Sequence, residues 1–136
     1  AGLYDSQGRY EQAEPLYLQA LALLKRLLGE DHPQVATSLN NLAGLYDSQG
    51  RYDQAEPLYL QASGLNKRLL GDTHPRVATD LNNLAGLYQS QGRYDQAEPL
   101  YLQALELKER VLGVNHPSTV TTRENLAILR QERGTH

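Results

Sequence analysis

Apolar residues recur along this chain at the spacing of an α-helix. Those of one stripe, three, four and seven positions apart, are Val35, Leu39, Leu42, Ala43 and Tyr46. Gly50 follows, and a residue without a Cβ readily takes the left-handed conformation that closes a helix. The pattern predicts an amphipathic helix, called helix A here, that stops at Gly50.

A second apolar stripe begins after this turn. Its members are Ala55, Leu58, Tyr59 and Ala62. They predict a helix B that ends near Gly71. Asp53 and Glu56 have the spacing of a capping box at its start, and Pro57 is placed at the edge of the first helical turn. The segment DTHP then leads to another helix, with Pro75 close to its first turn.

The helix pair returns at a fixed period. Setting Ala1 under Ala43 and Ala85 aligns the chain without gaps, and Ala127 opens a partial fourth copy. The full copies cover residues 1–42, 43–84 and 85–126. One helix pair cannot bury both of its faces, so neighbouring copies must stack to build a continuous core. The period therefore predicts an all-α solenoid of antiparallel helix pairs that forms a single domain over residues 1–136.

The signature inside each copy resembles the tetratricopeptide repeat family. A glycine ends helix A, followed by tyrosine two positions on, alanine five positions on and tyrosine nine positions on. The strings HPQVATSLNNLAGLY and QGRYDQAEPLYLQAL look like the 42-residue variety of kinesin light chains. The resemblance covers essentially the whole chain. It implies a right-handed superhelix whose A helices line a concave groove that binds peptides.

The two ends of the chain differ in pattern. Residues 1–7 correspond to the last two turns of a helix A, so we expect the N-terminal repeat to be truncated. The truncation should leave Leu16 and Leu23 exposed and favour a homo-oligomer. The chain has no methionine, which indicates that it begins inside something longer or has been processed. In the last helix, expected at about residues 117–133, Arg123 and Arg130 replace apolar residues. Two outward arginines suit a terminal capping helix, and we read this end as natural.

The net charge and hydropathy of the chain limit the classes of partner that it can bind. The formal net charge is −3, which does not favour nucleic acid as a partner. No apolar run approaches the ~20 residues that cross a bilayer, and no signal peptide is evident. We therefore expect a soluble, cytoplasmic protein without a membrane partner. The absence of cysteine excludes disulfides and thiol chemistry.

Catalytic and metal chemistry find little support. His32, His74 and His116 each precede a proline at the entry to a helix A, and residues one period apart cannot converge on one metal ion. A capping role is expected for them, and a packing role for the tyrosines. Capping also explains Asp53 and Glu56 without an acid–base role. Catalysis needs one unique constellation, so we expect no enzyme, cofactor or metal.

A polar face of helix A carries the candidate site. Small and polar side chains lie between the core positions, spaced so that they share one side of the helix. Asparagine presents both a donor and an acceptor to the backbone of an extended peptide, and glycine lets a ligand approach closely. The candidate peptide-binding residues are Thr37, Asn40, Asn41, Gly44, Asp47, Ser48, Thr79, Asn82, Asn83, Gly86, Gln89, Ser90 and Asn125.

Alternatives stay open for this face. The asparagines suit equally a solvated or helix-bridging role, and Glu124 and Ile128 interrupt the polar pattern in the last copy. The favoured function is a non-catalytic scaffold that binds a protein or peptide ligand. The alternative is an assembly module that stacks end to end, and a small-molecule or catalytic role comes third. Residues 63–66, which read SGLN, break the repeat and are expected to soften their helix.

Overall fold

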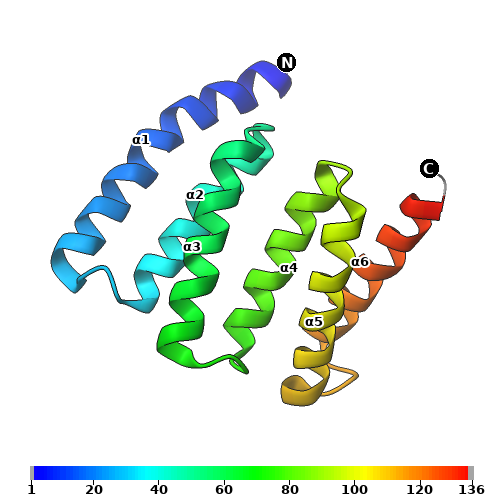
Figure 1. The fold of residues 1–136 in the computed structure, drawn as a ribbon. Coiled ribbons are helices and arrows are strands. Elements are labelled where there is room, and N and C mark those ends of the chain that lie inside the picture. Colours follow the sequence, from blue (N-terminus) through cyan, green and yellow to red (C-terminus); the bar gives the residue numbers. More distant parts are fainter. Residues whose placement is uncertain (1, 135–136) are drawn as a thin grey trace. The chain divides into compact units, whose positions relative to one another are not determined.

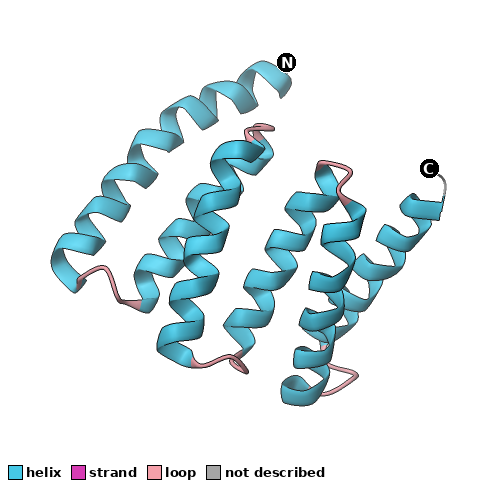
Figure 2. Cartoon of the chain, viewed as in Figure 1, coloured by secondary structure: helices cyan, strands magenta, loops and turns pink. Residues whose placement is uncertain are grey.

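The computed structural model describes residues 2–134, with side chains described for residues 12–134, and most of this part is helical. This part contains six α-helices and no strand (Figures 1 and 2). They are α1 (Gly2–Leu28), α2 (Pro33–Ser48), α3 (Tyr52–Leu70), α4 (Pro75–Ser90), α5 (Tyr94–Leu112) and α6 (Pro117–Gly134). The all-α prediction is confirmed. The A helices are α2, α4 and α6.

Two compact units make up the chain. The first, Ala1–Leu69, holds α1, α2 and almost all of α3, and the second, Leu70–His136, holds α4, α5 and α6. Each unit is described by itself below. The single repeat domain over residues 1–136 stays a prediction.

Histidine caps the start of every A helix. Nδ1 of His32, His74 and His116 accepts a hydrogen bond from the backbone N–H two residues further on, at 3.0, 3.1 and 3.1 Å. The proline between them needs no such partner, because it has no N–H. The expected capping role of these histidines is confirmed.

Glycine ends the A helices as predicted. Gly50 has a φ of 76°, and the backbone N–H of Arg51 donates to the carbonyl of Tyr46 at 2.8 Å, which is the Schellman pattern. Gly92 closes α4 in the same way. The turn also places the guanidinium of Arg51 4.5 Å from the ring centroid of Tyr46, so the turn closes with a cation–π contact.

The prediction of a capping box at the start of α3 is wrong. The carbonyl of Arg51 already accepts a hydrogen bond from the N–H of Ala55, so α3 begins at Tyr52 and Asp53 lies inside its first turn. There its carboxylate faces the positive end of the helix dipole. Pro57 likewise lies deeper than predicted, in the second turn. The helix continues through Pro57 because the hydrogen bond it removes is close to the helix start.

The N-terminal helix is longer than predicted. Residues 1–7 were expected to form a separate short helix, but α1 runs unbroken from Gly2 to Leu28 (Figure 1); Ala1 lies outside the described residues. A helix of two turns is too short to be stable alone, whereas continuing α1 adds one hydrogen bond for each residue fixed. The expected exposure of Leu16 and Leu23 is confirmed, with 65% and 45% of each residue exposed.

The core of each unit consists of the predicted apolar stripes. In the first unit, the stripe of α2 from Val35 to Tyr46 is buried, together with Ala55, Tyr59 and Ala62 of α3. Glu14 joins α1 to this core by accepting hydrogen bonds from Tyr46 at 2.9 Å and Arg51 at 3.2 Å. The bonds from Arg51 and then Tyr46 hold the pKa of Glu14 below its usual value.

The second unit is built around α5, which packs against both α4 and α6. Its central cluster combines Val77, Ala78 and Leu81 of α4 with Ala104 and Leu107 of α5. The core role predicted for the tyrosines is confirmed in part: Tyr88 and Tyr101 are buried here, whereas Tyr94 is half-buried and Tyr17 of the first unit is 38% exposed. The core of each unit thus lies on the side of its A helix opposite the predicted polar face.

Candidate functional site

The polar face of the first unit lies on α2. Thr37, Asn41 and Ser48 are exposed there, whereas Asn40, Gly44 and Asp47 are half-buried between them. The hydroxyl of Thr37 donates to the carbonyl of Pro33 at 3.3 Å, which fixes its direction. These six candidate residues therefore share one accessible side of one helix.

A tyrosine from helix B reaches this face from behind. The hydroxyl of Tyr59 hydrogen-bonds to the carboxylate of Asp47, and it lies 3.7 Å from where a Cβ on Gly44 would stand. Burial raises the pKa of Asp47 and raises that of Tyr59 to about 12. Gly44 thus lies over the tyrosine hydroxyl, and a Cβ there would make ordinary contact. The sequence analysis explained the glycine at this position by close approach of a ligand. Packing of Gly44 over the Tyr59 hydroxyl explains part of the same choice.

The second unit repeats this arrangement with a neutral side chain. The hydroxyl of Tyr101 donates to Oε1 of Gln89 at 2.8 Å, and Nε2 of Gln89 donates to Glu132 of α6 at 2.8 Å. Burial, followed by the charge of Glu132, raises the pKa of Tyr101 to about 12. The carboxylate of α6 therefore occupies the outer side of Gln89, a contact that the sequence did not predict.

The two asparagines of each pair have different surroundings. Oδ1 of Asn82 accepts a hydrogen bond from Thr122 of α6 at 3.4 Å, so Asn82 bridges two A helices. Of the roles left open for the asparagines, the contact of Asn82 corresponds to the helix-bridging one. The side chains of Asn41, Asn83 and Asn125, the second members of the pairs, have no hydrogen bond or ion pair with any described residue. Their amides are available to a ligand.

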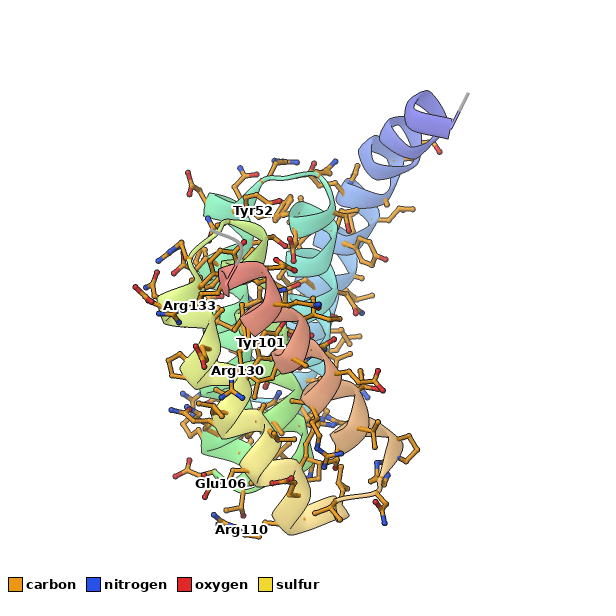
Figure 3. All side chains as sticks on the ribbon, turned by 90° about the vertical axis from the view of Figure 1, so that its right-hand side faces the viewer. Tyr52, Tyr101, Glu106, Arg110, Arg130 and Arg133 are labelled. Atoms are coloured by element: carbon orange, nitrogen blue, oxygen red, sulfur yellow. The ribbon has the colours of Figure 1, made fainter. Side chains whose placement is uncertain are left out.

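The last helix presents different chemistry. Glu124 and Ile128 are exposed where the other A helices carry asparagine and glycine. Arg123 and Arg130 are exposed as predicted, and each also pairs with α5, through Glu109 at 3.3 Å and Glu98 at 3.0 Å. Arg133, which lies on the same helix as Arg130 (Figure 3), adds ion pairs to Asp95 and Glu98. The polar face of the second unit is thus carried by α4, with Asn125 as its equivalent on α6.

The described residues contain neither a candidate membrane span nor a candidate metal site. Among residues 2–134 no helix combines the length and the apolar character that a membrane span requires. Among residues 12–134, whose side chains are described, no three histidine or acidic side chains gather closely enough to hold a metal ion.

Helix pairs that repeat in register, each closed by glycine and begun by a histidine cap, define an α-helical repeat protein. The chain belongs to the tetratricopeptide repeat family, whose model matches residues 1–68, 48–110 and 78–136. Repeats of this family identify a protein–protein interaction scaffold. The family resemblance seen in the sequence is confirmed.

Solved structures agree with this assignment. BtubC (BKLC) from P. vanneervenii is 30% identical over 97% of this chain, with a TM-score of 0.83. A second solved structure is that of a Podosopora anserina protein assigned as a kinesin light chain, with nearly identical TPR-like repeats. It is 27% identical over 96% of this chain, also with a TM-score of 0.83. This chain spans 53% and 62% of those two chains.

Proposed function

We propose that this chain is a non-catalytic scaffold that binds an extended peptide segment of a partner protein on the polar faces of its A helices. The observation that carries the proposal is the set of unengaged amides of Asn41, Asn83 and Asn125. An amide offers a donor and an acceptor to the N–H and C=O groups of an extended peptide. Small neighbours such as Gly44 and Gly86 leave its backbone room to approach.

The two faces differ in charge. Asp47 places a half-buried carboxylate on the face of α2, where Gln89 places an amide on the face of α4. Burial raises the pKa of Asp47, and a cation of the ligand beside it would relieve that cost. The peptide segment bound by the first unit is therefore expected to carry lysine or arginine.

A peptide display library tests this proposal without requiring that the partner be identified. Peptides of ten residues are selected on the intact chain, and their affinity is then measured for Asn41→Ala, Asn83→Ala and the control Gln103→Ala, an exposed amide on α5. Each amide contributes one or two hydrogen bonds, so each change on a polar face is expected to weaken binding about threefold to tenfold. Selected peptides that bind all three variants as tightly as the parent chain would contradict the proposal.

A second candidate function is assembly through α1. Tyr17 and Leu23 are 38% and 45% exposed, whereas their equivalents in the two later repeats are at most 8% exposed. Among the described side chains of α1, the other large apolar residues that are exposed are Leu16, Leu18, Leu27 and Leu28. Leu16, Leu23 and Leu27 share one side of α1, because they are seven and four positions apart. An exposed apolar stripe of this kind favours association with a second copy, which sedimentation over a range of concentrations measures.

A further inference from the structure

A pocket of about 460 Å³ lies within the first unit, away from the polar face of α2. It is an open pocket between the C-terminal end of α1, the loop between α1 and α2, and helices α2 and α3. Its apolar lining consists of the buried side chains Val35, Leu39 and Leu65. Val35 and Leu39 stand two positions before Thr37 and Asn41, which puts the pocket and the polar face on opposite sides of α2. The volume is within the roughly 300–1,000 Å³ of ligand pockets.

The pocket occurs where the chain departs from its own repeat. Gly64 lines it, and a Cβ added at Gly64 would meet nothing within 4 Å. The equivalent residue of the next repeat is Glu106, which pairs with Arg110 one turn along the same helix at 3.1 Å. Arg68, the equivalent of Arg110, has no such partner and reaches the loop instead.

The rim of the pocket has no net charge, but some of its charged side chains have no partner among the described residues. Arg68 pairs with Asp31 at 2.5 Å, and the two charges cancel. Lys25, Glu30 and Gln61 complete the rim, and none of these side chains has a hydrogen bond or ion pair with a described residue. One available cation and one available anion stand beside an apolar floor. A peptide unit, which has one acceptor and one donor and no net charge, can bind to both of these groups at once.

We propose that this pocket binds one aliphatic or aromatic side chain of a partner polypeptide as an anchor. The side chain rests on Val35, Leu39 and Leu65. The carbonyl of the anchor residue accepts a hydrogen bond from Lys25, and its N–H donates to Glu30. The site is separate from the polar faces of the A helices, so it can succeed or fail independently of the function proposed for them.

Blocked amino acids are suitable probes, because they carry a side chain and two peptide groups without charge. N-acetyl-leucine methylamide is titrated into the isotopically labelled chain and compared with N-acetylglycine methylamide by NMR. The leucine probe is expected to bind at least fivefold more tightly and to shift the backbone amide signals of Leu39, Gly64 and Leu65. The amide signals of Asn83 and Gly86, in the second unit, serve as the unaffected reference.

A variant that copies the neighbouring repeat gives the decisive comparison. Gly64→Glu fills the mouth of the pocket and supplies Arg68 with the partner that Arg110 has, so binding of the leucine probe is expected to fall at least fivefold. Gly64→Ala, which copies Ala22, also improves helix propensity while leaving the pocket open, so binding is retained. Equal binding by both variants would overturn the proposal. So would binding of 3-methylbutanol as tight as that of the leucine probe, since this alcohol lacks peptide groups.

Discussion

Lys108 of α5 donates a hydrogen bond from its ammonium group to Oγ1 of Thr122 on α6, at 2.8 Å. Lys108 is only 5% exposed, and among the described residues no carboxylate pairs with it. Desolvation by burial lowers its pKa. The equivalent residues of the other repeats, Leu24 and Asn66, carry no charge. The third repeat thus holds a buried cation that the fold stabilises with a neutral hydroxyl.

Lys108→Met is expected to stabilise the chain. A methionine of similar length removes the cost of burying a charge, and Thr122 keeps its bond to Asn82, so the free energy of unfolding should rise by ~1 kcal/mol at neutral pH. Urea denaturation measures the change. Lys67→Met, at an exposed position of α3, is the control and should change stability by less than ~0.5 kcal/mol. A loss of stability in Lys108→Met would show that the ammonium group has a favourable partner.

The same lysine predicts a pH dependence. Its pKa is lower in the folded chain than the ordinary 10.5, so between these two values the unfolded chain binds more protons and stability rises with pH. The advantage of Lys108→Met over the parent chain should therefore shrink as pH rises through this window. Burial raises the pKa of Tyr59 and Tyr101 to about 12, which lowers stability above pH ~10 in both proteins alike. Unfolding curves of the two proteins at neutral pH and near pH ~10 give this difference directly. A constant difference would contradict the prediction.

Local signals account for what the sequence could predict. The stripe from Val35 to Tyr46, the histidine caps and the turn at Gly50 each depend on a few neighbouring residues, and all are present. The start of α3 was misplaced because the carbonyl of Arg51, rather than the side chain of Asp53, begins the helix. The prediction of a separate helix over residues 1–7 was wrong, because the stability of so short a helix would depend on packing rather than on its own amino-acid sequence.

The candidate site was predictable only in part, because it depends on contacts between helices. The sequence placed Asn82 and Asn83 on one polar face but could not distinguish them, since the difference is the bond from Thr122, forty residues away along the chain. The pocket beside Gly64 has the same origin. A missing side chain in α3 matters only because the loop carrying Asp31 lies opposite.

The histidine cap of α4 offers a test of local stability. His74→Ala removes the acceptor of the Arg76 N–H, so the free energy of unfolding should fall by ~0.5–2 kcal/mol. His74→Asn keeps a side-chain acceptor at this position and should recover most of the loss. Thermal unfolding followed by circular dichroism compares the two variants. Equal destabilisation by both would mean that the imidazole acts through packing.

The exposed face of α1 predicts self-association. Leu23→Lys places a charge within this face, and we expect it to keep the chain monomeric at concentrations where the parent chain forms dimers or larger species. Sedimentation velocity measures both proteins over the same concentration range. Leu69→Lys, which changes a partly exposed leucine on α3, is the matched control and should leave association unchanged. A strictly monomeric parent chain would remove the assembly function.

The asparagine pair of α4 should separate folding from binding. Asn82→Ala removes the acceptor of the Thr122 hydroxyl, which stays fully buried, so we expect the free energy of unfolding to fall by ~0.5–1.5 kcal/mol. Asn83→Ala removes an amide that has no hydrogen bond with a described residue, so stability should hold while affinity for a selected peptide falls threefold to tenfold. Urea denaturation and a peptide titration of each variant decide the matter. If Asn83→Ala unfolds the chain and Asn82→Ala only weakens binding, the roles assigned to the two asparagines are reversed.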